Sequence, residues 1–119
     1  MIEKSDLKID WDNEAIQISK KIKAFYPRAN TSFRGKNLKI LKIKVLSIDV
    51  IKNEKYLFMS ADNSRTGIIL DVIENEGILI STKTDPIILL EAKLEGKNIS
   101  SKNQLIQQLN PSVGEYLSD

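Results

Sequence analysis

The strongest constraint on the fold is an alternation of apolar and lysine side chains over residues 37–47. The stretch reads N-L-K-I-L-K-I-K-V-L-S, and its period of two predicts a β-strand with one apolar face. The apolar phase slips by one residue between Ile40 and Leu41. A single β-bulge at that point would keep one face of the strand apolar, so we predict a bulge there.

Hairpin signals dominate the second half of the chain. Within residues 67–94, three apolar runs are separated by short turns, of which E-N-E-G and T-D-P are the clearest. Strands joined by such turns predict an antiparallel meander. Residues 56–59 add a candidate short strand in the otherwise unpatterned stretch 48–66.

Two helices are predicted to flank these strands. The first has Asp12 as its N-cap, ends before Pro27 and packs Trp11 against its start. Its apolar face is spaced by three and four residues and consists of Ala15, Ile18, Ile22 and Phe25, all predicted to lie in the core. The second helix is short, reads S-K-N-Q-L-I-Q-Q-L, and is capped by Ser100 or Ser101.

The order of elements is therefore helix, about five or six strands, helix. The 119 residues have the size of a single domain. We predict a mainly β fold of the α+β class: a small OB-like β-barrel with an N-terminal helix and a short C-terminal helix. Residues 1–10 are predicted to be a linker or edge segment, and residues 11–119 the single OB-like domain.

The composition removes the commonest catalytic groups. The chain has no histidine and no cysteine, so Ser–His and Cys–His nucleophile pairs and thiolate metal sites are impossible. The glycines are isolated, and the carboxylates lie scattered at predicted turns and strand ends. We predict no catalytic residue, no metal site and no cofactor in this chain. It has neither a signal peptide nor a membrane-length apolar run, which predicts a cytoplasmic protein without a membrane partner.

Basic residues form the one pattern above background. Residues 20–47 contain no aspartate or glutamate. One interpretation is a solvated face whose edge lysines block sheet aggregation, and the other is a surface that follows phosphates; composition favours neither. The predicted polyanion-binding residues are Lys20, Lys23, Arg28, Arg34, Lys36, Lys39, Lys42, Lys44, Lys93 and Lys97.

The type of basic residue narrows the class of polyanion. Lysine predominates over arginine, which favours point-charge contact with backbone phosphates over bidentate reading of bases. Aromatic residues that could stack on unpaired bases are few, namely Phe33, Tyr26 and Tyr56. We therefore predict a structured, double-helical RNA that is recognised by shape, and no DNA partner.

Several segments resemble, in the same order, the C-terminal domain of methionyl-tRNA formyltransferases. They are I-D-W at 9–11, I-S-K-K-I-K-A-F-Y-P at 18–27, G-K-N-L-K-I-L-K at 35–42, G-I-I-L at 67–70, L-L-E-A-K-L-E-G-K at 89–97 and V-G-E-Y-L at 113–117. The resemblance implies an OB-type barrel that follows an N-terminal catalytic domain and holds initiator tRNA for translation initiation. The catalytic domain, with its site for 10-formyltetrahydrofolate, would lie outside this chain, so the chain alone is predicted to be non-catalytic.

The resemblance has departures, and two other interpretations stay open. Lys23 stands where the family usually has arginine, which keeps the charge but not the bidentate contact. Lys93 and Leu94 stand where Gln-Pro is typical. The chain could instead be an accessory domain of a sugar-nucleotide or folate formyltransferase that packs on its catalytic domain without RNA, or a free-standing protein-binding barrel. The basic residues favour initiator tRNA over both.

Overall fold

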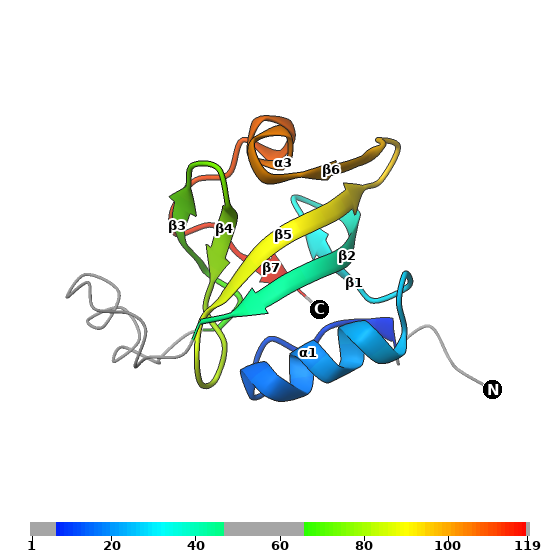
Figure 1. Cartoon of the computed structure of the whole chain (residues 1–119), viewed down its shortest axis with the longest axis vertical. Coiled ribbons are helices and arrows are strands. Elements are labelled where there is room, and N and C mark those ends of the chain that lie inside the picture. The colour runs from blue at the N-terminus through cyan, green and yellow to red at the C-terminus, as the bar shows by residue number, and fades with distance from the viewer. Residues whose placement is uncertain (1–6, 47–65, 119) are drawn as a thin grey trace.

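The computed structural model describes residues 7–46 and 66–118 (Figure 1). Every pairing between its named strands is antiparallel, so the predicted mainly β fold of the α+β class is confirmed. The predicted strand at 56–59 lies outside the described residues. The elements are α1 (Ala15–Ala24), β1 (Asn30–Phe33), β2 (Lys36–Val45), β3 (Ile69–Ile73), β4 (Gly77–Ile80), β5 (Ile87–Leu94), β6 (Ile99–Ser101), α3 (Lys102–Leu109) and β7 (Leu117–Ser118).

One sheet carries the architecture. Its strand order is β3-β4-β5-β2-β1-β7, and β6 pairs with β5 beside this path. The first and last strands of this order, β3 and β7, lie close together. Leu117 N–H donates to the Gly67 carbonyl at 2.7 Å, and Ile69 N–H donates to the Glu115 carbonyl at 2.9 Å. Full closure into an OB-type barrel stays a prediction. The long strands β2 and β5 lie between α1 on one side and α3 with β6 on the other (Figure 1).

The predicted bulge in β2 is confirmed. The register with β5 shifts between Ile40 and Lys42, which leaves the buried Leu41 as the extra residue. A second shift follows at once: Lys42 pairs with Glu91 and Ile43 pairs with Leu89, so Leu90 is the extra residue of β5. The sequence pattern did not indicate this second shift. Together the shifts keep Leu38, Ile40, Ile43 and Val45 on the core and the lysines of β2 on the outer face.

The core lies between α1, the inner face of the sheet and α3. Ala15, Ile18 and Ile22 of α1 are buried in it, as predicted. Trp11 is also buried, and its Nε1–H donates to Thr31 Oγ1 at 3.0 Å. Phe25 is only half-buried and outside this cluster, so the prediction that it lies in the core is wrong. The reason is that α1 ends at Ala24, and the backbone at Phe25 leaves the helical conformation.

The start of α1 also differs from the prediction. Asp12 is not the N-cap, because the helix begins at Ala15 and Glu14 holds the cap position without a side-chain cap hydrogen bond. The Asp12 N–H instead donates to Asp10 Oδ1 at 3.0 Å, in a turn that precedes the helix. The Ala15 N–H donates to Thr84 Oγ1 at 2.9 Å, so a distant loop satisfies one helix donor. Ser101 holds the cap position of α3, as predicted, but it makes no side-chain cap hydrogen bond.

The first described residues pack on the sheet. Ile9 is fully buried, and its N–H donates to the Asn30 carbonyl at 2.8 Å. The Lys21 ammonium donates to the Lys8 carbonyl, which ties the same segment to α1. In the part of the chain that the structure describes, no helix is long and apolar enough to cross a membrane.

Candidate nucleic-acid interface

Most of the predicted basic residues are exposed, and they divide into two groups by the element that carries them. We call Lys20, Lys23 and Arg28, on and just after α1, the helix group. The strand group lies on β2, β5 and the β5–β6 turn and consists of Lys36, Lys39, Lys42, Lys44, Lys93 and Lys97. Lys39 is half-buried, and the other five members of the strand group are exposed.

Strand pairing assembles the strand group from two distant parts of the sequence. Lys39 of β2 lies directly opposite Lys93 of β5. Like charges in this position destabilise a sheet, so the pair has a cost that a purely structural surface would avoid. Lys42 faces Glu91 across the same two strands, which places one carboxylate within the group.

A shallow cleft lies beside the Lys39–Lys93 pair. Its volume is about 200 Å³, and it is lined by Asn37, Lys39, Lys93, Leu94, Glu95 and Gly96. Two hydrogen bonds hold its edges together: Glu95 N–H donates to the Asn37 carbonyl at 2.8 Å, and Asn37 N–H donates to Glu95 Oε1 at 3.4 Å. Among the described residues, neither lysine ammonium has an ion-pair partner. The cleft therefore offers two cationic donors and one carboxylate to a ligand.

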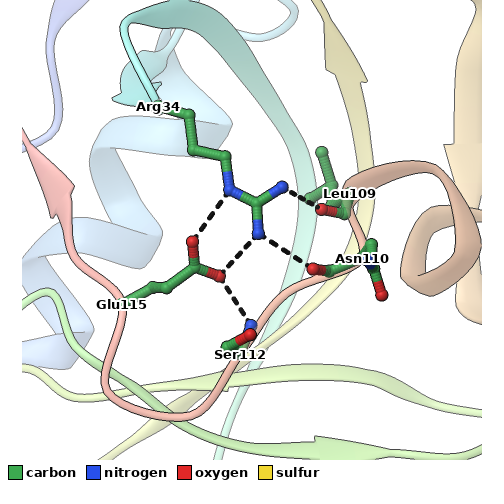
Figure 2. A network of polar contacts seen from close by, with 5 residues as sticks. All are labelled: Arg34, Leu109, Asn110, Ser112 and Glu115. Atoms are coloured by element: carbon green, nitrogen blue, oxygen red, sulfur yellow. Dashed lines mark hydrogen bonds and ion pairs between the residues drawn. The ribbon is translucent and has the colours of Figure 1, made fainter.

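Arg34 has a different role from the other basic residues (Figure 2). Its Nε and Nη2 donate to the two Glu115 carboxylate oxygens at 2.8 and 2.9 Å. The remaining bonds of the guanidinium go to the carbonyls of Leu109 and Asn110, both at 2.9 Å. These bonds tie the β1–β2 turn to the segment after α3. That Arg34 binds RNA stays a prediction, and Arg34 is not included in the surface that we propose for RNA binding.

The Arg34–Glu115 pair predicts a pH dependence of stability. The hydrogen bond from Arg34, followed by the one from the Ser112 backbone N–H, lowers the pKa of Glu115 below its usual value. A carboxyl whose pKa is lowered on folding stabilises the protein above the pKa of the unfolded chain, about 4.3, and loses that contribution as pH falls through the folded pKa. We therefore expect Glu115→Gln to have a lower melting temperature than the unaltered chain at pH 7. This difference in melting temperature should shrink toward zero in acid.

Thermal melts between pH 7 and pH 3 check this expectation. The matched control is Glu74→Gln, which neutralises an exposed carboxylate on the β3–β4 turn. A melting difference for Glu115→Gln that stays constant with pH would contradict the assignment, because it would not depend on the carboxylate charge.

The aromatic candidates for base stacking do not form a platform. Phe33 is only 2% exposed, so its prediction as a stacking residue is wrong. Its ring belongs to the core and lies 4.6 Å below the Arg34 guanidinium. Tyr26 is 59% exposed and is available for stacking, whereas Tyr56 lies outside the described residues. Among the described aromatic residues, Tyr116 is also exposed, at 49%. Two exposed rings fit a partner that offers backbone more than unpaired bases.

No arrangement for catalysis is visible in the described residues. Within 7–46 and 66–118, no three or more aspartate or glutamate side chains gather in a way that could hold a metal ion. A cleft of about 270 Å³ lies between β3 and α3 and includes Glu74 and Asn103. Another, of about 530 Å³, lies beside the start of α1 and includes Glu14, Ile16 and Asp85. This last cleft is the largest of the three, and the hydroxyls of Ser19 and Thr84 also line it. Among the described residues, neither hydroxyl is hydrogen-bonded to the Glu14 or Asp85 carboxylate.

Comparison with known proteins gives one consistent family. The family model described as "Formyl transferase, C-terminal domain" matches residues 1–110. The chain is 83% identical over its whole length to "Methionyl-tRNA formyltransferase" of Prochlorococcus marinus strain AS9601. It is 35% identical, over 97% of its length, to the protein of the same name from Synechococcus sp. strain CC9902. In both comparisons the chain spans 36% of the length of the relative.

Proposed function

This chain belongs to the formyl transferase C-terminal domain family, and from that premise we propose that it is the tRNA-holding domain of a methionyl-tRNA formyltransferase. Its partner would be initiator Met-tRNA. A catalytic domain outside the chain would transfer the formyl group from 10-formyltetrahydrofolate to the methionine amino group. Residues 11–119 would then be one OB-like domain, linked through the preceding segment to that catalytic domain.

The observation that carries this proposal is the strand group. Six lysines lie on two paired strands and the adjoining turn, and two of them face each other without a neutralising partner among the described residues. The six lysines outnumber the two carboxylates that lie among them, Glu91 and Glu95, so this surface has a positive net charge. Ammonium groups in such an array bind successive backbone phosphates and release condensed counterions, whatever the base sequence.

Binding and orientation are the contributions that these residues can make to formyl transfer. A domain that holds the body of the tRNA raises the effective concentration of its aminoacyl end at a tethered catalytic site. The chain supplies no imidazole for proton transfer. None of the three clefts contains an aromatic side chain that would stack on the pteridine ring. These clefts therefore do not fit the folate, and we assign its site to the catalytic domain.

A double charge reversal, Lys23→Glu with Lys42→Glu, tests the proposal. Both side chains are exposed, so the variant is expected to fold, with a small loss of stability because the second substitution places a carboxylate opposite Glu91. Fluorescence anisotropy with labelled initiator tRNA should show binding too weak to measure at physiological salt. At lower salt, the slope of log affinity against log salt should fall by about 2, roughly 1 for each lost phosphate contact.

The matched control is Lys8→Glu with Lys83→Glu, which makes the same change in net charge at two exposed lysines outside both groups. This control should retain nearly all of the affinity. Equal losses in the two variants would mean that net charge alone drives binding. Unchanged binding in the Lys23/Lys42 variant would refute the proposed surface.

A further inference from the structure

The cleft between β2 and the β5–β6 turn contains an unexpected mixture of charges for a phosphate-binding surface. The cleft has a volume of about 200 Å³. Lys39 and Lys93 supply two positive charges to its lining, and Glu95 supplies one negative charge. A carboxylate beside bound phosphate costs binding energy through repulsion. The position of Glu95 therefore calls for a neutral donor in the ligand, close to the phosphate.

The two lysines are placed to share one anion. Directly opposite residues on antiparallel strands have Cβ atoms about 4.5–5.5 Å apart, well within the reach of two flexible four-carbon side chains. A phosphate between the two ammonium groups would accept hydrogen bonds from both and relieve their mutual repulsion. In the described part of the chain, no carboxylate does so.

Glu95 is held at the edge of the cleft by backbone contacts. Its N–H donates to the Asn37 carbonyl at 2.8 Å, and its Oε1 accepts the Asn37 N–H at 3.4 Å. Oε2 has no donor among the described residues and is available to a ligand. In RNA the ribose 2′-hydroxyl is a neutral donor beside the backbone phosphate, and DNA lacks it.

We propose that this cleft is a one-nucleotide RNA backbone site. Lys39 and Lys93 bind one phosphate, and Glu95 accepts the hydrogen bond of a neighbouring 2′-hydroxyl. The inference rests on the proposed function and deepens it, because it gives the domain a means of distinguishing RNA from DNA. The carboxylate lowers the affinity for any backbone without that hydroxyl.

The test compares two probes with the full 119-residue chain. One is a double-helical RNA hairpin, and the other is the same hairpin with 2′-O-methyl riboses, which keep the A-form helix and the phosphates but remove the hydroxyl donor. The unaltered chain should bind the unmodified hairpin about tenfold more tightly, the effect expected of one hydrogen bond to a charged group. Glu95→Ala should bind the two hairpins equally.

Three further variants separate the contributions of the cleft residues. Lys39→Ala with Lys93→Ala should weaken binding of both hairpins. Glu95→Gln should retain part of the preference, because its amide oxygen still accepts a hydrogen bond. Glu91→Ala, which removes a carboxylate from β5 outside the cleft, should retain the full preference and serves as the matched control. Trp11 fluorescence, from the one buried tryptophan, shows whether each variant folds.

The outcomes distinguish this inference from the proposed function. If the unaltered chain binds both hairpins equally well, the Glu95 assignment is wrong and the tRNA-holding role stands. A preference that persists in Glu95→Ala would also overturn the assignment, because it would then come from a group other than Glu95. If the unaltered chain binds neither hairpin at any salt concentration, both proposals fail.

Discussion

Initiator-tRNA binding is expected to weaken by roughly a thousandfold when salt is raised from about 50 to 200 mM, for a surface that contacts about six phosphates. The helix and strand groups together present eight exposed cationic side chains, enough for that number of contacts. Each neutralised phosphate releases condensed counterions, and added salt opposes that release. A plot of log affinity against log salt should therefore have a slope of about −5.

An anisotropy titration series over this range measures the slope directly. The Lys8→Glu, Lys83→Glu control should have the slope of the unaltered chain, because neither residue belongs to the two groups. Binding whose affinity hardly changes with salt would contradict the account, since it would have to come from apolar or uncharged polar contacts.

Replacing Gly77 with alanine is expected to destabilise the domain by about 3 kcal/mol or more, enough to prevent folding of a marginally stable chain. A Cβ at this first residue of β4 would lie 2.0 Å from the Leu89 carbonyl oxygen and 3.0 Å from its carbonyl carbon. These atoms belong to the backbone of β5 and cannot rotate away. Relief would require β4 to separate from β5, with loss of the Ile78–Leu89 pairing in the core.

Denaturant unfolding followed by Trp11 fluorescence measures this loss. Gly96→Ala is the matched control: a Cβ there meets no atom within 4 Å, but the positive φ of +80° still strains alanine. The control should lose only about 1–2 kcal/mol. A Gly77→Ala variant as stable as the unaltered chain would contradict the described contact between β4 and β5.

Local sequence patterns predicted the parts of the fold that depend on neighbouring residues. The alternation in β2, its bulge at Leu41 and the apolar face of α1 could all be read from spacing alone. The predictions for Asp12 and Phe25 were wrong at the two ends of α1, where the helix starts later and stops earlier than the apolar spacing indicates. The Ala15 N–H is satisfied by Thr84, which is 69 residues away, and no local pattern indicates such a partner.

For the candidate site, too, local patterns predicted some features, and others depend on the folded chain. The acid-free run predicted a set of basic residues that proved largely exposed, because alternation on a half-buried strand sends lysines outward. The pairing of Lys39 with Lys93 depends on the register between β2 and β5, which neither strand specifies by itself. Arg34 belongs to the same basic run, yet its partner Glu115 lies 81 residues away, and only the folded chain brings them together.

The central claim is that this domain holds a folded, double-helical RNA by its backbone. The most direct test titrates the 119-residue chain with initiator tRNA and with an unstructured RNA of equal length and charge, at the same low salt. We expect clearly tighter binding to the folded tRNA, because the described surface has many exposed lysines and few exposed rings on which unpaired bases could stack. Equal or tighter binding to the unstructured RNA would contradict it.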